Sequence, residues 1–256
     1  MIKGIVFFDL DGTLLNSFGR VSEDVILSIK KLINNHYMPV LATGRSLFEV
    51  RELMNKTEIT SMVGMNGQIV IWNNKVIFNK TINKEVVDKI TIFSNKKNVG
   101  ISYYNDKRNA ISLKNELILQ TYHNISSPVP PIDRYMYKNE PINMMLIATD
   151  VFDEEYQKTF PELSFVRNSP YCMDVFSKGN NKARAIEKLI KFLSMNNLPI
   201  YAFGDGSNDI EMFKLADYSI AMENGVEKLK RIATHVTGSN DNAGITDGLK
   251  YFKLID

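Results

Sequence analysis

Two aspartates two residues apart, at the end of an apolar run, are the strongest chemical signal in this chain. Asp9 and Asp11 follow the run Ile5–Phe8, and a Gly–Thr pair comes directly after them. A short apolar run of this kind is typical of a buried strand, where side chains two residues apart lie on the same side. Two carboxylates held that close repel each other unless a cation or a shared proton lies between them. The pair therefore indicates a divalent metal site, acid–base chemistry, or both.

The elements around this pair alternate between strands and helices. Over the first 80 residues we expect strands at 4–9, 39–42 and 62–64, helices at 21–34 and 46–55, and a hairpin at 68–79. Ser22 is a plausible N-cap for the first helix, and Asn73-Asn74 should turn the hairpin because asparagine tolerates positive φ. Such alternation predicts a parallel sheet with crossover helices.

The middle of the chain has a different pattern. Here we expect helices at 84–96 and 115–122, strands at 100–104 and 142–148, and a proline-rich connection at 127–131 that suits neither a helix nor a central strand. The alternation then resumes, with helices at 182–195 and 208–215 and strands at 200–203 and 219–222. We therefore predict an α/β fold with a Rossmann-like parallel-sheet core formed by 1–82 and 179–256. An inserted α+β domain at 83–178 interrupts this core.

Polar clusters follow several of the predicted core strands. The first is Asp9–Thr13, the second is Thr43-Gly44-Arg45, and a later one is Gly204–Asp209. Lys182 lies at the start of the helix that follows the insert. Ligands of open parallel sheets bind outside the carboxyl ends of the strands, so we expect these distant segments to meet at one edge.

The chemistry of these clusters suits a phosphoryl group and a metal. Asp9, Asp11 and Asp205, with Asp209 as a further candidate, provide the hard oxygen ligands that Mg²⁺ prefers. The Thr43 hydroxyl, nearby amides and the ammonium of Lys182 would attract an anion. Together these groups suit a transition state that spreads charge over phosphoryl oxygens.

Within such a site the two opening aspartates would divide the work. Asp9 is the natural nucleophile and would form an aspartyl-phosphate. Asp11 can protonate the leaving oxygen and then deprotonate water. Arg45 is either a substrate contact or an ion-pair partner, and both roles stay open.

The chain resembles the haloacid dehalogenase superfamily, and within it the Cof-like phosphatases with a type IIB cap. The matching motifs are Asp9-x-Asp11-Gly12-Thr13, Thr43-Gly44-Arg45, Lys182 and Gly204-Asp205-Gly206-x-Asn208-Asp209. Asn66-Gly67 and Ala221-Met222-x-Asn224 agree as well. The resemblance covers about 1–82 and 179–256, whereas the insert matches by size and position.

This resemblance implies a Mg²⁺-dependent phosphatase whose inserted cap selects the substrate. It implies that Asp9 is the nucleophile and a metal ligand, and that Asp11 is the acid–base residue and gives its backbone carbonyl to the metal. Asp205 would be the other carboxylate ligand, and Asp209 would act on the metal directly or through water. The phosphoryl group would be bound by Thr43, Gly44, Lys182 and Asn208.

The composition of the chain indicates which partners and which cellular location to expect. The chain has 256 residues, is 44% hydrophobic and 23% charged, and carries a net charge of +2. These values are ordinary for a soluble globular protein and give no reason to expect nucleic acid or a membrane as a partner. The lone Cys172 and the lack of a signal peptide or a long apolar run favour a cytoplasmic location. No obligate protein partner is evident.

We therefore expect an enzyme that hydrolyses small phosphorylated metabolites, such as sugar phosphates or phosphorylated cofactors. A phosphomutase on the same fold is one alternative, and it would interconvert isomers instead of releasing phosphate. A non-catalytic protein that binds a phosphorylated ligand is another. Such a protein would be expected to lack Asp9, Asp11, Lys182 or Asp205, and all four are present.

Overall fold

The computed structural model describes residues 2–125 and 127–256, and these form two compact units. The first unit contains residues 2–45, Glu49–Phe78 and Asn181–Asp256. The second contains Asn79–Asn180 together with Ser46–Phe48. The assignment of 83–178 as a cap that selects the substrate stays a prediction.

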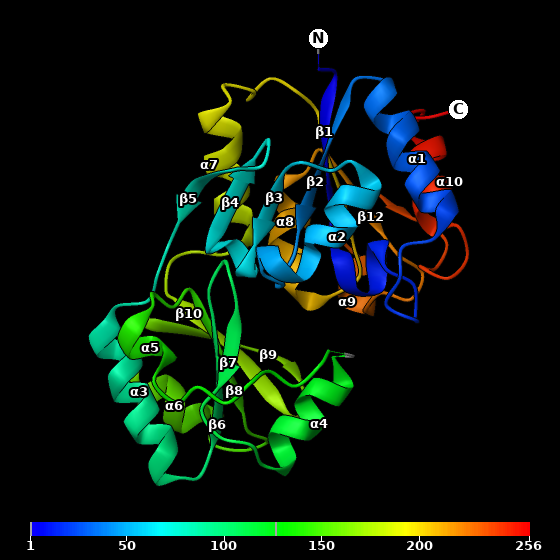
Figure 1. Cartoon of the computed structure of the whole chain (residues 1–256). Helices are drawn as coiled ribbons and strands as arrows, with labels where there is room; N and C mark the ends of the chain where they lie inside the picture. The colour runs from blue at the N-terminus through cyan, green and yellow to red at the C-terminus, as the bar shows by residue number, and fades with distance from the viewer. Residues whose placement is uncertain (1, 126) are drawn as a thin grey trace. The chain divides into compact units, whose positions relative to one another are not determined.

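Within the described residues, the first unit is built on an eight-stranded sheet with the order β13-β12-β11-β1-β2-β3-β4-β5. Its strands are β1 (Gly4–Phe8), β2 (Tyr37–Ala42), β3 (Met62–Gly64), β4 (Ile69–Trp72), β5 (Lys75–Asn79), β11 (Ile200–Gly204), β12 (Tyr218–Ala221) and β13 (His235–Val236). Neighbouring strands from β13 to β3 are parallel, and β4 runs antiparallel to β3. The register pairs Phe8 with Phe203 and with Leu41, so β1, β2 and β11 end at the same edge of the sheet (Figure 1).

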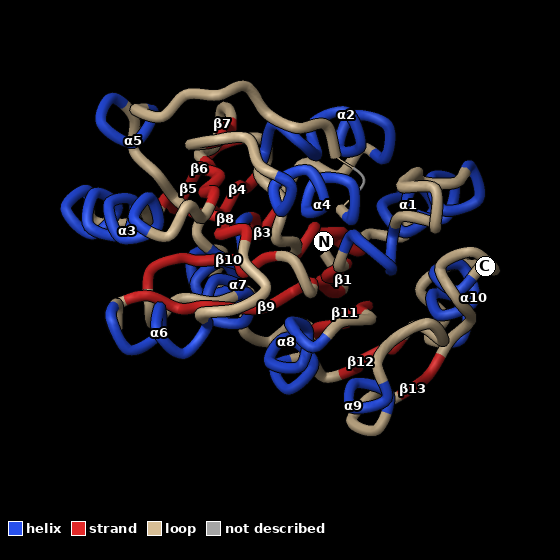
Figure 2. The backbone as a smooth tube through the Cα atoms, turned by 90° about the horizontal axis from the view of Figure 1, so that it is seen from below, coloured by secondary structure: helices blue, strands red, loops and turns tan. Residues whose placement is uncertain are grey.

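Helices cover both faces of this sheet, as the second view shows (Figure 2). They are α1 (Glu23–Asn34), α2 (Leu47–Thr57), α7 (Lys182–Phe192), α8 (Ile210–Leu215), α9 (Glu227–Lys230) and α10 (Gly244–Tyr251). Ile5 and Phe7 of β1 belong to the core that α7 and α8 bury, whereas the Phe8 ring stacks on Phe203, whose face α10 covers. Because β1 is buried on both faces, it reads as a continuous apolar run in the sequence.

Local signals in the sequence explain where several elements begin and turn. The Ser22 side chain accepts a hydrogen bond from the backbone N–H of Val25, at 3.4 Å, and so caps α1 as expected. The hairpin β4–β5 turns at Asn73 and Asn74, whose φ angles are 46° and 61°. These predictions are confirmed.

The second unit has an antiparallel sheet whose described strands follow the order β7-β6-β8-β10-β9. The strands are β6 (Gly100–Tyr104), β7 (Asn109–Ile111), β8 (Met144–Ala148), β9 (Leu163–Ser169) and β10 (Cys172–Ser177). The helices α3 (Lys84–Lys96), α5 (Met136–Asn139) and α6 (Asp153–Thr159) share one hydrophobic core with it, and α4 (Glu116–Asn124) contributes to a smaller one. The buried hydroxyls of Tyr103 and Tyr156 pair with those of Thr91 and Ser94.

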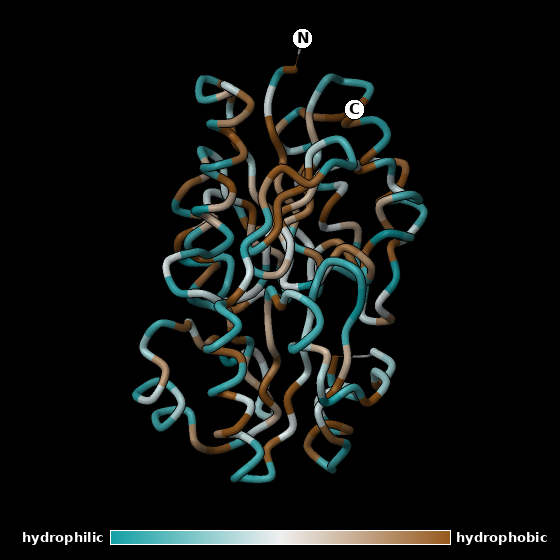
Figure 3. The backbone as a smooth tube through the Cα atoms, turned by 60° about the vertical axis from the view of Figure 1, so that its left-hand side comes forward, coloured by the Kyte–Doolittle hydropathy of each residue, from teal (hydrophilic) through white to brown (hydrophobic). Residues whose placement is uncertain are grey.

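The predicted fold class, a Rossmann-like parallel-sheet unit with an inserted α+β unit, is confirmed. Apolar residues gather along the strands, and the outer loops are largely hydrophilic (Figure 3). The sequence did not predict β7, β9, β10, α5 and α6 of the second unit, nor α9, β13 and α10 of the first. No helix in the described part of the chain is long and apolar enough to span a membrane.

A buried and an exposed residue of α7 provide a matched test of this core. Ile186 is fully buried, whereas Phe192, at the end of the same helix, is 61% exposed. We expect Ile186→Ala to lower the free energy of unfolding by about 2–5 kcal/mol, because it leaves a cavity. Phe192→Ala should change it by only about 0.5 kcal/mol, as for other surface substitutions. Urea denaturation followed by circular dichroism measures both values, and equal losses would contradict this packing.

Candidate active site

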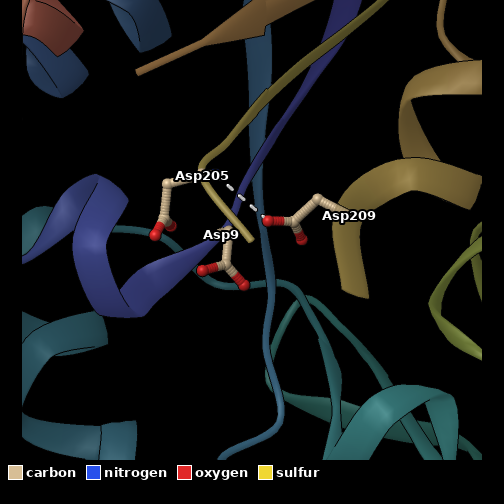
Figure 4. Close-up of side chains that lie close together, drawn as sticks. All are labelled: Asp9, Asp205 and Asp209. Atoms are coloured by element: carbon tan, nitrogen blue, oxygen red, sulfur yellow. Dashed lines mark hydrogen bonds between the residues drawn. The ribbon is translucent and has the colours of Figure 1, made fainter. Parts of the chain in front are cut away.

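Among the described residues, three aspartates converge where β1 and β11 end. Asp9 follows β1, Asp205 follows β11, and Asp209 ends the short turn Ser207–Asp209. One carboxylate oxygen of each lies within 4.8 Å of the others. Asp9 and Asp209 are buried and Asp205 is half-buried. Figure 4 shows the three side chains close together; we call them the aspartate cluster.

Lys182 is the positive partner of this cluster. Its ammonium donates hydrogen bonds to Asp9 and, at 2.8 Å, to Oδ1 of Asp209. Lys182 is only 3% exposed, so these ion pairs lie away from water. It is the first residue of α7, and the Asn181 side chain caps this helix by accepting from the N–H of Arg184 at 2.9 Å. The start of α7 therefore determines where the ammonium lies.

Gly67 allows α7 to begin so close to the sheet. Its φ is +91°, and a Cβ at this position would lie 2.3 Å from the backbone oxygen of Asn181. A residue with a side chain would push away the helix that carries Lys182. Gly67 of the Asn66-Gly67 pair thus has a structural role here.

Asp209 also organises the turn that carries Asp205. Its Oδ2 accepts hydrogen bonds from the backbone N–H groups of Asp205, at 3.2 Å, and Gly206, at 3.0 Å. Its Oδ1 faces Lys182. Both oxygens of Asp209 thus have protein partners.

The Gly12-Thr13 pair fits Asp205 against the loop after β1. The Thr13 hydroxyl donates to Oδ1 of Asp205 at 2.8 Å. Gly12 has a φ of +78°, and a Cβ there would lie 2.4 Å from Oδ2 of Asp205. A glycine is therefore required both by the backbone conformation and by the close carboxylate. This explains why this pair directly follows the two aspartates.

Asp11 lies apart from the aspartate cluster. The strand ends at Phe8, and Asp11 lies in the wide turn Leu10–Leu14 with φ −76° and ψ 121°. The two-residue alternation of strand β1 therefore does not extend to Asp11, and the Asp11 carboxylate is not part of the group formed by Asp9, Asp205 and Asp209. Its side chain is 56% exposed and forms an ion pair with Arg45. Of the two open roles for Arg45, the structure shows the ion pair.

The remaining predicted site residues lie at the same edge of the first unit. Thr43 follows β2, is 1% exposed, and accepts a hydrogen bond from the N–H of Arg45 at 3.1 Å. Gly44 is half-buried, and Asn208 is exposed in the turn between Asp205 and Asp209. Their contacts with a phosphoryl group stay predictions.

Two asparagines brace the loop after β1, and reasoning from the sequence assigned neither of them a role. The Asn224 side chain donates to the carbonyl of Gly12 at 2.8 Å, and its Oδ1 accepts from the N–H of Asn240 at 3.0 Å. The Asn240 side chain donates to the carbonyl of Leu15 at 2.8 Å. Asn224 belongs to the stretch Ala221-Met222-x-Asn224 that resembles the family, so a signal for it was present in the sequence. Asn240 had no such signal, because hydrogen bonds between distant segments leave no local sequence pattern.

The electrostatics of the site favour a bound cation. Burial raises the pKa of Asp9 well above its usual range, and the charge of Asp209 raises it further, against the opposing effect of Lys182. Burial also raises the pKa of Asp205 to about 6. Burial alone would lower the pKa of Lys182, but Asp209 and Asp9 outweigh it and raise this pKa. Carboxylates outnumber the ammonium, and their hard oxygens fit a divalent ion such as Mg²⁺.

The raised pKa of Asp205 predicts how pH affects stability when no metal is added. Its pKa rises from 3.8 to about 6 in the folded protein, so its protonated form stabilises the fold. This contribution is complete below the unfolded pKa and is lost as the pH rises through about 6. In chelator, Asp205→Asn should therefore raise the free energy of unfolding by about 1–3 kcal/mol near pH 7.5 and by much less near pH 4.

Denaturant unfolding at the two pH values measures this difference. The exposed Asp150, which lies in the second unit, supplies a control, and Asp150→Asn should not alter the pH dependence. An Asp205→Asn variant that is less stable than the parent near neutral pH would contradict the buried, repelled carboxylate.

Comparison with known proteins agrees with this geometry. Residues 6–249 match the family described as haloacid dehalogenase-like hydrolase. The Bacillus subtilis (strain 168) protein named "Putative phosphatase YkrA" is 28% identical over 256 residues, which cover 100% of both chains. The 5-amino-6-(5-phospho-D-ribitylamino)uracil phosphatase YwtE of the same strain is 26% identical, with 94% of each chain covered.

A solved structure extends the similarity to the fold. The HAD subclass IIB sugar phosphatase BT4131 superposes with a TM-score of 0.86 at 26% sequence identity. The superposition covers 98% of this chain and 100% of that one. The chain therefore belongs to the haloacid dehalogenase-like hydrolases and is a phosphomonoester hydrolase of that family.

Proposed function

We propose that this chain is a Mg²⁺-dependent phosphatase that hydrolyses small phosphorylated metabolites through an aspartyl-phosphate. The observation that carries this proposal is the placement of Asp9, a buried carboxylate at the end of β1 that touches Lys182 and faces two further carboxylates. A phosphoryl group beside Asp9 would meet a nucleophile and a positive charge at once.

The residues that would hold Mg²⁺ are those of the aspartate cluster and the backbone carbonyl of Asp11. The cation would neutralise charge on the phosphoryl oxygens and allow the cluster to stay ionised near Asp9. Lys182 and the Thr43 hydroxyl would bind the phosphoryl oxygens from the protein side, with Gly44 and Asn208 at the same edge. This division leaves Asp9 free to act as nucleophile.

Two chemical steps follow from these roles. In the first, a carboxylate oxygen of Asp9 forms a bond to phosphorus while the bond to the leaving oxygen breaks, and Asp11 gives that oxygen a proton. In the second, Asp11 takes a proton from water, whose oxygen then bonds to phosphorus. The Asp9–phosphorus bond breaks, inorganic phosphate leaves, and Asp9 is restored.

For the substrate we propose a phosphate ester of a sugar or of a sugar-like chain. The relatives support this class, because one is named a sugar phosphatase and another acts on a phospho-ribityl compound. Both names describe a phosphate on a carbon chain that carries hydroxyl groups. Phosphorylated cofactors stay a second class to test. We propose that the inserted unit, 83–178, selects among them.

Removal of the nucleophile is the direct test of this function. We expect the parent to release phosphate from members of a metabolite panel in the presence of Mg²⁺, and Asp9→Asn to lower kcat by at least about 10³-fold. Phosphate release measured with a colorimetric assay checks this. Asp150→Asn should keep the parent rate. Undiminished activity of Asp9→Asn would overturn the aspartyl-phosphate mechanism.

Metal removal tests the role of the aspartate cluster. A chelator should abolish phosphate release, and added Mg²⁺ should restore it. Asp205→Asn should require a higher Mg²⁺ concentration for half-maximal activity, because one carboxylate ligand is lost. Titration of activity against Mg²⁺ for both proteins gives the two concentrations. Full activity in chelator would refute a metal-dependent mechanism.

The same panel separates the alternative functions. A phosphomutase would convert one sugar phosphate into its isomer without net release of phosphate. A binding protein would retain a phosphorylated ligand unchanged. Analysis of the products by phosphorus NMR distinguishes hydrolysis from both outcomes.

A further inference from the structure

The ion pair between Arg45 and Asp11 uses both oxygens of the carboxylate. Nε of Arg45 donates to Oδ2 of Asp11 at 2.9 Å, and a terminal nitrogen of the guanidinium donates to Oδ1 at 2.5 Å. A bidentate ion pair of this kind, with two parallel hydrogen bonds, determines both the direction and the plane of a carboxylate, which a single hydrogen bond does not.

Hydrogen bonds hold the backbone of Arg45 in place. Arg45 follows β2, its N–H donates to the Thr43 hydroxyl at 3.1 Å, and its carbonyl accepts from the N–H of Met65 at 3.0 Å. Asp11 lies in the irregular turn Leu10–Leu14, next to a glycine with positive φ. The Arg45 backbone is therefore fixed at the end of β2, so its guanidinium can orient the Asp11 side chain.

The Arg45–Asp11 ion pair contributes little to the stability of the fold. The Asp11 side chain is 56% exposed and that of Arg45 is 25% exposed. Ion pairs so open to water contribute only about 0–1 kcal/mol to stability. The pair nevertheless orients the carboxylate that follows the buried Asp9 by two residues.

We propose that Arg45 is a positioning residue that acts through Asp11, holding the carboxylate of the acid–base residue in the orientation from which it serves the leaving oxygen and the attacking water. This proposal rests on the proposed phosphatase function. Arg45 acts on the proton transfer and not on the phosphoryl group itself. Its loss should therefore matter in proportion to how much the leaving group needs a proton.

Two substrates with different leaving groups test this role. One is a sugar phosphate that the parent hydrolyses, whose alkoxide needs protonation, and the other is p-nitrophenyl phosphate, whose phenolate leaves readily without it. We expect Arg45→Ala to lower kcat/KM for the sugar phosphate by about 10- to 100-fold, part of the usual contribution of an acid–base residue. For p-nitrophenyl phosphate kcat/KM should stay within about threefold. Arg45→Lys cannot form the two parallel hydrogen bonds, so its kcat/KM for the sugar phosphate should lie between those of the parent and of Arg45→Ala.

A double-mutant cycle shows whether Arg45 acts through Asp11. In the Asp11→Asn background, Arg45→Ala should cause little further loss, because the group that it positions is already gone. Arg51, exposed on α2, provides the matched control, and Arg51→Ala should preserve both rates. The thermal midpoint of Arg45→Ala should stay close to that of the parent.

Several results would overturn the proposal. Equal losses on both substrates would mean that Arg45 contacts the phosphoryl group, and losses that add to those of Asp11→Asn would mean that it acts independently. Unchanged rates would mean that the ion pair has no role in catalysis. If the parent released no phosphate from any substrate, the proposed function itself would fail, and this outcome is distinct from the others.

Discussion

Repulsion among carboxylates is the constraint on which this active site depends. Asp9, Asp205 and Asp209 present oxygens within 4.8 Å of one another at the end of the central strands. Burial makes this arrangement more costly, and it raises the pKa of Asp9 and Asp205. Lys182 offsets part of the repulsion by pairing with Asp9 and Asp209. The remaining negative charge is what a divalent cation would balance.

Several features of the first unit serve to keep these charges in place. Gly67 permits the close approach of α7, which begins with Lys182. Gly12 and Thr13 accommodate the carboxylate of Asp205, and Asp209 holds the turn that follows β11. Residues that look like a short turn signature in the sequence are thus contacts of the charged side chains. Tight packing here keeps the ionised groups at fixed distances, as catalysis by electrostatic stabilisation requires.

The structure also separates the two opening aspartates. Asp9 is buried beside an ammonium, whereas Asp11 is half in water and held by a guanidinium. These different surroundings fit the roles that we propose, a nucleophile for Asp9 and an acid–base residue for Asp11. Their separation arises because β1 ends at Phe8 and the chain then enters a wide turn.

The sequence by itself determined the fold class and singled out the residues that we propose for the site. Apolar runs, helix caps and the Asn73-Asn74 turn are local signals, and they predicted most elements of the first unit. The second unit was less predictable. β10 pairs with β8, which lies further back in the chain, and such pairing leaves weak local patterns, whereas β7 and β9 pair with the strands next to them in the chain and were still missed.

Only the tertiary structure decided how these residues pair with one another. Lys182 reaches Asp9 across 173 positions, and Asn224 reaches Gly12 across 212. The strand period suggested that Asp9 and Asp11 would lie on the same side. Because β1 ends at Phe8, Asp11 lies in the following turn and forms an ion pair with Arg45 instead. Residue types reveal which chemistry is available, whereas distances between charges depend on how strands and helices from separate parts of the chain pack together.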